Sequence, residues 1–233
     1  MNGYIDGIDF INLPAEKYWT FPKSKKDVKT DIHNRIYSGD YLGAEKVDGT
    51  YQKAIRDEDG NFHLIARNQS VSGEMTDKVE WCPQFSPFFE ALPNGTCLLC
   101  ELHMAQNTSS RKITTIMGCL KDKAIARQQK DGYLWLYVFD VWAYNGHSCL
   151  SLTARERFEL LDAIAKKYYY ASYVRCAKYY EGDALWNELM RVMSSGGEGI
   201  VITRADSHAE PGKRTAQKTL KIKKELDNYI DCF

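Results

Sequence analysis

The stretch GAEKVDGTY, residues 43–51, ends a strand-like run with a lysine and places Asp48-Gly49 two residues later. Two interpretations are open. Asp-Gly is a common turn dipeptide, so the stretch is on one interpretation a hairpin turn beside a solvated lysine. On the other, the turn presents Lys46 as a nucleophile. The motif Lys-x-Asp-Gly is short, so the choice depends on what else the chain carries.

Length and composition limit the classes of protein. The 233 residues suit one large domain, or a medium domain with an appendage, and suffice for a hydrophobic core. Lys+Arg and Asp+Glu number 31 each, so a nucleic-acid partner would have to bind a local basic patch. No apolar run is long enough to span a bilayer, and the N-terminus lacks the pattern of a signal peptide. Seven cysteines, most within apolar runs, favour buried thiols in a reducing cytoplasm.

One cysteine spacing resembles a metal site, namely Cys97-x-x-Cys100-x-x-His103 in the run TCLLCELHM. Zinc sites normally need a fourth ligand and a turn between the cysteines. This run is apolar and strand-like, and on a strand Cys97 and Cys100 would point to opposite faces. We therefore expect a core strand here.

Five stretches carry helix signals. Asp27 is a candidate N-cap for a helix that Gly39 stops, and Thr153-x-x-Glu156 forms a capping box before another helix. Helical spacing predicts three inward faces: Val28, Ile32 and Ile36; Phe158, Leu161 and Ile164; and Leu185, Leu189 and Val192. The predicted helices cover 27 to about 37, a short stretch from 86, 121–130, a stretch from 153, and 183 to about 195.

The other periodic stretches predict strands. They cover 41–47, 50–57, 61–68, 96–104, 133–146, 197–203 and 219–224. Turns are expected at Glu58-Asp59-Gly60 and at Asn145-Gly146. Strands and helices alternate too rarely for a doubly wound sheet, so the pattern predicts an α+β fold. We expect a single domain over 1–233, with 1–26 as a loosely packed N-terminal leader.

Reactive residue types recur in order along these elements. Lys46, Asp48 and Gly49 are followed by Arg67-Asn68 at a strand end, Glu101 closing an apolar strand, Phe139-Asp140, Glu198-Gly199 and Lys221-Ile222-Lys223. In order, spacing and residue type this series resembles the collinear nucleotidyltransferase motifs of ATP-dependent polynucleotide ligases and, more distantly, of RNA capping enzymes. The resemblance covers about 41–224. Residues 138–161, VFDVWAYNGHSCLSLTARERFELL, and 211–224, PGKRTAQKTLKIKK, are similar to DNA ligases in particular.

The resemblance implies a nucleotidyltransferase domain of mainly antiparallel sheets flanked by helices, with a nucleotide cleft between the sheets. It also implies ATP as the nucleotide and Mg²⁺ as the metal. Lys46 would attack the α-phosphorus of ATP and form a lysyl–AMP intermediate. A free lysine is almost wholly protonated at neutral pH and cannot attack. We expect Lys221, Lys223 and Mg²⁺ to favour the uncharged amine and to offset charge on the phosphate oxygens.

The resemblance assigns roles to the other residues. Lys221 and Lys223 would share one strand face toward a phosphate, while Ile222 faces the core. The remaining expected roles are these: Phe139 stacks on adenine, Glu101 holds ribose hydroxyls, Glu198 binds Mg²⁺, Arg67 contacts phosphate or ribose, Asp48 orients the lysine or its turn, and Gly49 permits close backbone approach. The structural alternatives are a solvated strand edge for the lysines, a core position for Phe139, solvent for the glutamates and a surface ion pair for Arg67.

The chain departs from the family at two places. DNA ligases often have arginine, and RNA ligases asparagine, where this chain has Tyr51. Arg56, on the same predicted strand, is a candidate to compensate. Ten residues follow Lys223, too few for the OB-fold domain that usually follows in DNA ligases. We therefore expect a stand-alone adenylation domain, or one that a separate OB-fold or DNA-binding polypeptide completes.

The leading hypothesis is an ATP-dependent DNA ligase catalytic domain that seals 5′-phosphate/3′-hydroxyl nicks, of the compact kind found in phages or small repair systems. Nicked duplex DNA would be its partner, and membranes would not. Lysines and arginines at 213–224, with no acid among them, predict weak and salt-sensitive DNA binding. Two alternatives remain open: an RNA ligase of the same superfamily, and a non-catalytic nick- or end-binding subunit that retains the scaffold.

Overall fold

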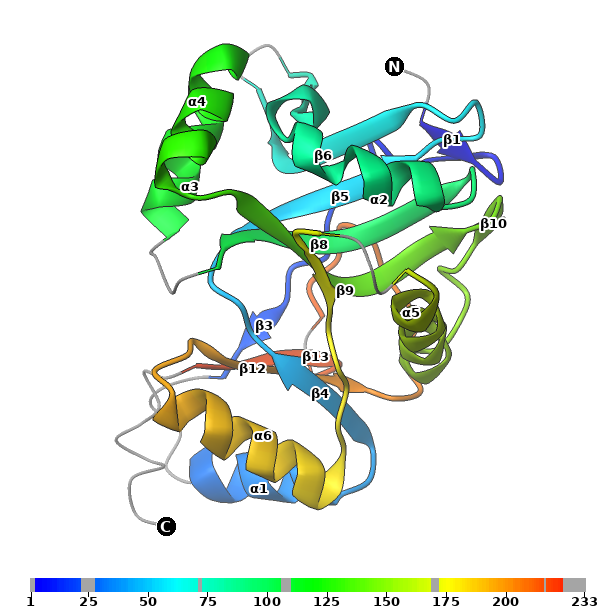
Figure 1. Cartoon of the computed structure of the whole chain (residues 1–233). Helices are drawn as coiled ribbons and strands as arrows, with labels where there is room; N and C mark the ends of the chain where they lie inside the picture. Colours follow the sequence, from blue (N-terminus) through cyan, green and yellow to red (C-terminus); the bar gives the residue numbers. More distant parts are fainter. Residues whose placement is uncertain are drawn as a thin grey trace. The chain divides into compact units, whose positions relative to one another are not determined.

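The computed structural model describes residues 3–21, 28–70, 73–105, 110–168, 172–215 and 217–223. These residues form two compact units, each built from segments that are distant in sequence (Figure 1). Unit 1 comprises the residues up to Pro14, Asp48–Ser151 and Arg157–Cys176. Unit 2 comprises Ala15–Val47, Leu152–Glu156 and the residues from Ala177. In the opening stretch of sequence, the boundary falls between Val47 and Asp48.

Unit 1 is built on a seven-stranded sheet. Its strands are β5 (Thr50–Arg56), β6 (Phe62–Gln69), β7 (Met75–Asp77), β8 (Thr96–Met104), β9 (Leu134–Tyr144), β10 (His147–Ser148) and β11 (Val174–Cys176). The order is β10-β9-β8-β5-β6-β7, all antiparallel, and β11 pairs in parallel with β9. Both predicted turns are present, with positive φ at Gly60 (+87°), Asn145 (+53°) and Gly146 (+80°).

Unit 1 also contains helices α2 (Ser86–Ala91), α3 (Ser110–Met117) and α4 (Lys121–Asp131) and most of α5 (Ala154–Lys167), with short 3₁₀ turns at Val79–Trp81 and Pro83–Phe85. The capping box of α5 forms as predicted: the Thr153 amide donates to Glu156 Oε2 at 2.7 Å, and the Glu156 amide donates to Thr153 Oγ1 at 3.3 Å. The first turn of α5 is grouped with unit 2 and the rest with unit 1. Of these elements of unit 1, sequence reasoning missed α3, β7, β10 and β11.

The N-terminal segment is firmly packed, so the expectation of a loose leader is wrong for residues 3–13. Strands β1 (Tyr4–Ile5) and β2 (Ile8–Asp9) pair with each other, and Ile5 and Phe10 are fully buried. The buried Lys53 ammonium donates to the carbonyls of Phe10, Ile11 and Leu13 at 2.6–2.7 Å. Burial lowers the pKa of Lys53 to about 8. The rest of the predicted leader includes a basic cluster, KSKK at 23–26, which lies outside the described residues.

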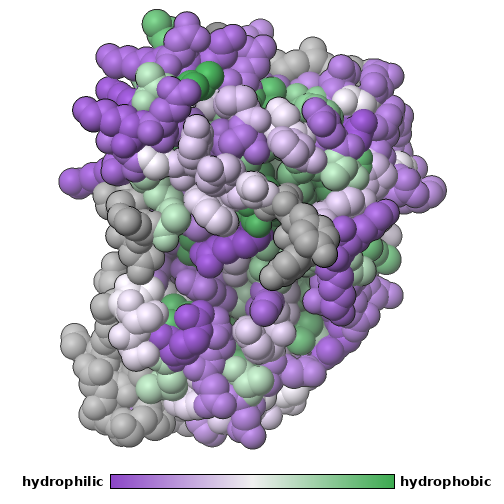
Figure 2. All heavy atoms as spheres, in the orientation of Figure 1, coloured by the Kyte–Doolittle hydropathy of each residue, from purple (hydrophilic) through white to green (hydrophobic). Residues whose placement is uncertain are grey.

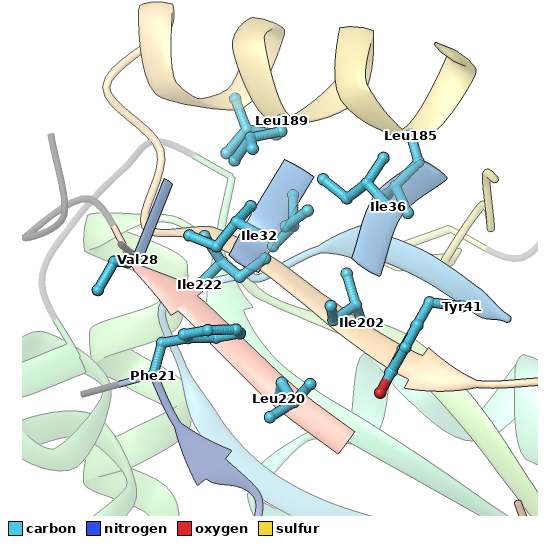
Figure 3. Packing of buried hydrophobic residues seen from close by; sticks show 12 residues of the cluster. Phe21, Val28, Ile32, Ile36, Tyr41, Leu185, Leu189, Ile202, Leu220 and Ile222 are labelled. Carbon is cyan, nitrogen blue, oxygen red and sulfur yellow. The ribbon is translucent and has the colours of Figure 1, made fainter. Parts of the chain in front are cut away.

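Unit 2 is a four-stranded sheet with two helices against one face. The strand order is β3 (Trp19–Thr20), β13 (Thr219–Lys223), β12 (Gly199–Arg204) and β4 (Tyr41–Glu45). Within this sheet the β3–β13 pair is parallel, and the β13–β12 and β12–β4 pairs are antiparallel. Helices α1 (Val28–Tyr37) and α6 (Gly182–Ser194) carry the predicted apolar faces. Figure 3 shows Ile32, Ile36, Leu185 and Leu189 of these faces pointing toward the sheet, which carries Ile202, Leu220 and Ile222. The candidate cap Asp27 lies outside the described residues.

The α+β fold with mainly antiparallel sheets is therefore confirmed. On the face drawn in Figure 2, hydrophilic residues predominate and hydrophobic ones appear in small separate groups. Among the described residues, no helix is both long and apolar enough to span a bilayer. The described cysteines are all free thiols, and Cys97 and Cys100 are fully buried in strand β8, as predicted.

Candidate active site

Lys46 follows directly after β4 and lies beside the first residues of β12. Its backbone amide donates to the Gly199 carbonyl at 2.8 Å, which extends the β4–β12 pairing by one residue. Its ammonium donates to Glu198 Oε2 at 2.6 Å. A residue 152 positions away in sequence is thus in direct contact with the predicted nucleophile.

Lys223 reaches the same carboxylate from the neighbouring strand. Its Nζ lies 3.1 Å from Glu198 Oε1, because Lys223 is directly opposite Gly199 in the β12–β13 register. We call Lys46, Glu198 and Lys223 the lysine–carboxylate cluster. Ile222 is fully buried on the other face, and Lys221, two residues before Lys223, lies with its Nζ 5.9 Å from the centre of the Tyr18 ring. The predicted alternation along this strand is confirmed.

Gly199 is what allows Glu198 to approach Lys223. Its φ is +134°, and a Cβ at this position would lie 1.9 Å from the Ile222 carbonyl oxygen. Only glycine combines this φ with such close approach of two backbones. The sequence Glu198-Gly199 therefore fixes the carboxylate directly before β12.

The cluster is an ion-pair network. Sequence reasoning expected positive neighbours to keep Lys46 uncharged. In the structure the Lys46 ammonium is ion-paired with Glu198, so attack on phosphorus requires this pair to separate and a proton to leave. The uncharged amine stays a prediction.

A second group of predicted residues shares one face of the unit 1 sheet. Tyr51 and Glu101 are directly opposite in the β5–β8 register. The Tyr51 ring centre lies 6.2 Å from that of Phe139, and the Arg67 guanidinium carbon lies 5.0 Å from the Tyr51 ring centre. Phe139 is half-buried and Arg67 is exposed. We call Tyr51, Arg67, Glu101 and Phe139 the aromatic–arginine group.

Glu101 lies within β8 and does not close it, because the strand continues to Met104. Gly49 packs against this strand: a Cβ on Gly49 would lie 2.4 Å from the Leu102 carbonyl oxygen and 2.6 Å from Glu101 Cγ. Gly49 thus permits close backbone approach to β8, and its role in nucleotide binding stays a prediction. Asp48 is exposed, and its carboxylate makes no hydrogen bond within the described part of the chain, so its role stays a prediction.

Arg56 does not compensate for Tyr51. Its guanidinium donates to the carbonyls of Phe89, Glu90 and Leu92 at the end of α2. Residues 51 and 56 are five positions apart on one strand, and such positions point to opposite faces. Arg56 is therefore a structural residue.

A buried ion pair beside Phe139 escaped sequence reasoning. Arg157 Nε donates to Asp140 Oδ1 at 2.8 Å and Nη2 to Oδ2 at 3.2 Å, and both side chains are buried. The pair joins α5 to β9 next to Phe139. Its signal was available, because Arg157 lies four residues before the inward-facing Leu161.

The donor atoms of Glu198 fit Mg²⁺. This ion prefers hard oxygen ligands and commonly uses one or two carboxylates together with phosphates and water. Among the described residues, no three His, Cys, Asp or Glu side chains gather into a metal site, so a magnesium ion here would depend on phosphate oxygens. Both carboxylate oxygens of Glu198 contact lysines, and a metal ion would take over one of these contacts.

The basic C-terminal stretch is less positive than its sequence indicated. Glu210, just before it, pairs with Lys213 at 3.3 Å and with Lys218 at 2.5 Å. These ion pairs lower the pKa of Glu210. Two of the lysines expected to bind DNA are thus partly neutralised, and Lys224 lies outside the described residues.

The two sheets and their helices have the fold of ligase nucleotidyltransferase domains. One unit carries the lysine–carboxylate cluster, and the other carries the aromatic–arginine group. The chain belongs to the family of ATP dependent DNA ligase domains, whose model matches residues 23–223. Among proteins with curated descriptions, none matches the sequence significantly.

Solved structures with this fold include three ligases. The ligase domain of LigD from M. tuberculosis has a TM-score of 0.65 and 18% identity, over 93% of this chain and 61% of that one. The ATP-dependent DNA ligase of bacteriophage T7, in complex with ATP, has a TM-score of 0.57 and 16% identity, over 91% of this chain and 69% of that one. The Chlorella virus DNA ligase-adenylate has a TM-score of 0.55 and 16% identity, over 91% of this chain and 67% of that one. The chain spans about three fifths of the length of the two LigD structures.

Proposed function

We propose that this chain is the catalytic domain of an ATP-dependent DNA ligase and seals nicks through a Lys46–AMP intermediate. The observation that carries the proposal is the lysine–carboxylate cluster. Two lysines from strands far apart in sequence meet at one carboxylate, in a family whose members are DNA ligases. We further propose that both units act as one adenylation domain.

The first step joins Lys46 to AMP. Lys46 Nζ gives up a proton, and its lone pair forms a bond to the α-phosphorus of ATP. The bond from that phosphorus to the bridging oxygen breaks, and pyrophosphate leaves. AMP then passes from Lys46 to the 5′-phosphate of the nick. Finally the 3′-hydroxyl attacks that phosphate, the phosphodiester forms and AMP leaves.

Residues of unit 2 supply charge for these steps. Lys223, with Lys221 beside it, offsets negative charge on phosphate oxygens, which is where most catalysis of phosphoryl transfer lies. A phosphate that took over the Lys223 contact would leave Glu198 available to a metal ion. Mg²⁺, when bound, would neutralise phosphate charge and help pyrophosphate to leave.

Residues of unit 1 bind the nucleoside part in this proposal. The half-buried Phe139 ring stacks on adenine, and Glu101 accepts hydrogen bonds from ribose hydroxyls. Arg67 contacts a phosphate or the ribose, Gly49 keeps the backbone close to Glu101, and Asp48 orients the turn after Lys46. The shared sheet face of Arg67, Glu101 and Phe139 supports these roles.

The substrate we propose is nicked duplex DNA, in the cytoplasm of a bacterial or phage-infected cell. Tyr51, where DNA ligases often have arginine, favours a second candidate, an RNA ligase of the same superfamily. A separate OB-fold or DNA-binding polypeptide that completes the reaction remains a hypothesis. Nick sealing that required such an added protein would support it.

A labelling assay tests the proposal. The protein is incubated with α-³²P-labelled ATP and Mg²⁺, denatured, and examined for acid-labile label on the chain. We expect label on the wild type, none on Lys46→Ala, and an unchanged amount on Lys123→Ala, which removes an exposed lysine of α4. Competition between nicked DNA and nicked RNA then identifies the preferred substrate. Intact DNA binding without label under any condition would overturn the enzyme and favour a non-catalytic nick-binding subunit.

A further inference from the structure

Tyr51 is at the centre of the aromatic–arginine group. Glu101 is its direct neighbour on β8, and the β5–β6 register places Arg67 next to it on the other side. The Arg67 guanidinium lies over the Tyr51 ring, 5.0 Å from its centre, and the ring lies 6.2 Å from Phe139 at an interplanar angle of 53°. Tyr51 is thus the side chain that connects Arg67 with Phe139.

Contact with the Tyr51 ring limits the placement of the Arg67 side chain. Arg67 is exposed and lies two residues before the end of β6, where a long side chain has many rotamers available. A cation over an aromatic face is attracted by the ring's quadrupole, which favours one placement of the guanidinium. The N–H groups lie in the guanidinium plane, so a guanidinium stacked by its face can still bind a phosphate through its edge.

We propose that Tyr51 is a positioning residue, whose ring holds the Arg67 guanidinium beside Glu101 and Phe139 so that it binds a phosphate group of the reaction. This inference rests on the proposed function. The phosphate belongs either to ATP or to the 5′ end of the nick. Arg56 cannot serve in this place, because its guanidinium is bound to the carbonyls that end α2.

The experiment compares four variants with the wild type: Tyr51→Phe, which keeps the ring, Tyr51→Leu, which removes it, Arg67→Ala, and the double variant Tyr51→Leu/Arg67→Ala. One arm measures the ATP dependence of lysyl–AMP formation. The other uses protein adenylated beforehand and freed of ATP, and measures AMP transfer to a nick that carries a 5′-phosphate. An effect in the first arm assigns the phosphate to ATP, and an effect in the second assigns it to the nick.

We expect Tyr51→Phe to resemble the wild type and Tyr51→Leu to lose roughly 2- to 30-fold in one arm, the range of a cation–π interaction. The loss should appear in KM or in binding of the nick and leave the maximal rate nearly unchanged. In the Arg67→Ala background, Tyr51→Leu should have no further effect, because the ring acts through the guanidinium.

Phe62→Leu is the matched control. It removes the ring under Arg56 on the same two strands, where the guanidinium carbon lies 5.5 Å from the ring centre. We expect it to lower thermal stability without changing either arm. Tyr51→Leu with wild-type values in both arms, or with an equal loss in the Arg67→Ala background, would overturn the inference. A wild type that forms no lysyl–AMP would instead overturn the proposed function, so the two failures are distinguishable.

Discussion

Glu198 joins Lys46 and Lys223, yet these ion pairs contribute little to stability. The three side chains are between 17% and 33% exposed, and partly solvated ion pairs typically contribute less than ~1 kcal/mol. The strict geometry of Gly199, which brings the carboxylate there, is therefore better explained by chemistry than by stability.

His63 is the residue at which pH should act on the fold. Its Nδ1 lies 2.8 Å from Asp77 and its Nε2 3.2 Å from Asp57. Burial opposes the charged ring, but hydrogen bonds and attraction from both carboxylates exceed it and raise the pKa of His63 above 6.5. Burial opposes the charged forms of Asp57 and Asp77, but other contacts exceed it and lower both pKa values. Asp57 accepts hydrogen bonds from Asn61 and His63, and Asp77 accepts them from His63 and from the backbone amides of Leu64 and Val79.

The free energy of unfolding should therefore depend on pH in a defined way. The stabilisation from His63 is fully present below pH 6.5 and is lost as the pH rises through the higher pKa of the folded protein. The stabilisation from Asp57 and Asp77 is lost as the pH falls below 3.8. Urea unfolding as a function of pH measures both limits.

His63→Gln should remove the loss of stability above pH 6.5 and destabilise the protein by ~3 kcal/mol at pH 6, because the buried carboxylate of Asp57 and the partly buried carboxylate of Asp77 lose their charged partner. His147→Gln, at an exposed position in β10, is the control. A His63→Gln variant that kept the wild-type pH dependence would show that another group is responsible.

Single polar residues in inward positions were the hardest to interpret from sequence. Lys53 shares a strand face with Ile55 on β5, and Arg157 shares a helical face with Leu161, so their burial follows from periodicity alone. Their partners do not, because the carbonyls of residues 10–13 and the carboxylate of Asp140 are distant in sequence. Periodicity gives the direction of a side chain, whereas its partner depends on the tertiary fold.

The β12–β13 pair is the element that the site depends on most. Gly199→Ala should destabilise the protein by ~3 kcal/mol or more, because the new methyl group would overlap the Ile222 carbonyl and open the ladder beside Glu198. Lysyl–AMP formation should fall with it. Unfolding in urea and the labelling assay measure the two effects.

Gly39→Ala is the control that separates the cost of positive φ from the cost of steric overlap with Ile222. Gly39 also has positive φ (+78°), but a Cβ there meets no atom within 4 Å. We expect a loss of only ~1 kcal/mol and unchanged labelling. Equal losses for the two variants would show that the contact with Ile222 is unimportant.

Long periodic elements could be predicted, and short ones could not. The faces of α1 and α6, the capping box of α5 and the Asn145-Gly146 turn follow from local chemistry, and the structure has them all. Strands β1, β2, β3, β7 and β11 have only two or three residues each, too few to show a period. They form because neighbouring strands provide partners.

Charge is the property of the whole molecule that bears on DNA. The formal net charge is zero, so binding to a duplex depends on local excess. Glu210→Gln releases Lys213 and Lys218 from their ion pairs. We expect tighter binding to nicked duplex DNA. The slope of the logarithm of the binding constant against the logarithm of salt concentration should become more negative by about one to two.

Glu80→Gln is the control for this change. Glu80 pairs with Lys121 at 2.9 Å, also at an exposed position, but in unit 1. It alters net charge by the same amount and should leave the salt dependence nearly as it is. An equal steepening in both variants would indicate a response to total charge, and would contradict a DNA-binding role for the stretch near Glu210.

The division into two units was beyond prediction from sequence. Each unit takes segments from distant parts of the chain, and the boundary at Val47–Asp48 lies inside the motif that opens the series. Motif order indicated the family and most of the candidate residues. Which of them touch one another was settled by strand register, as for Tyr51 beside Glu101.

The buried ammonium of Lys53 allows the packing of the N-terminal segment to be followed by chemical modification. Reagents that modify amines need a solvent-exposed nitrogen. The Lys53 nitrogen becomes exposed only after its hydrogen bonds to the carbonyls of Phe10, Ile11 and Leu13 have broken. The rate at which Lys53 is modified, relative to the exposed lysines, therefore reports how often that segment detaches from β5.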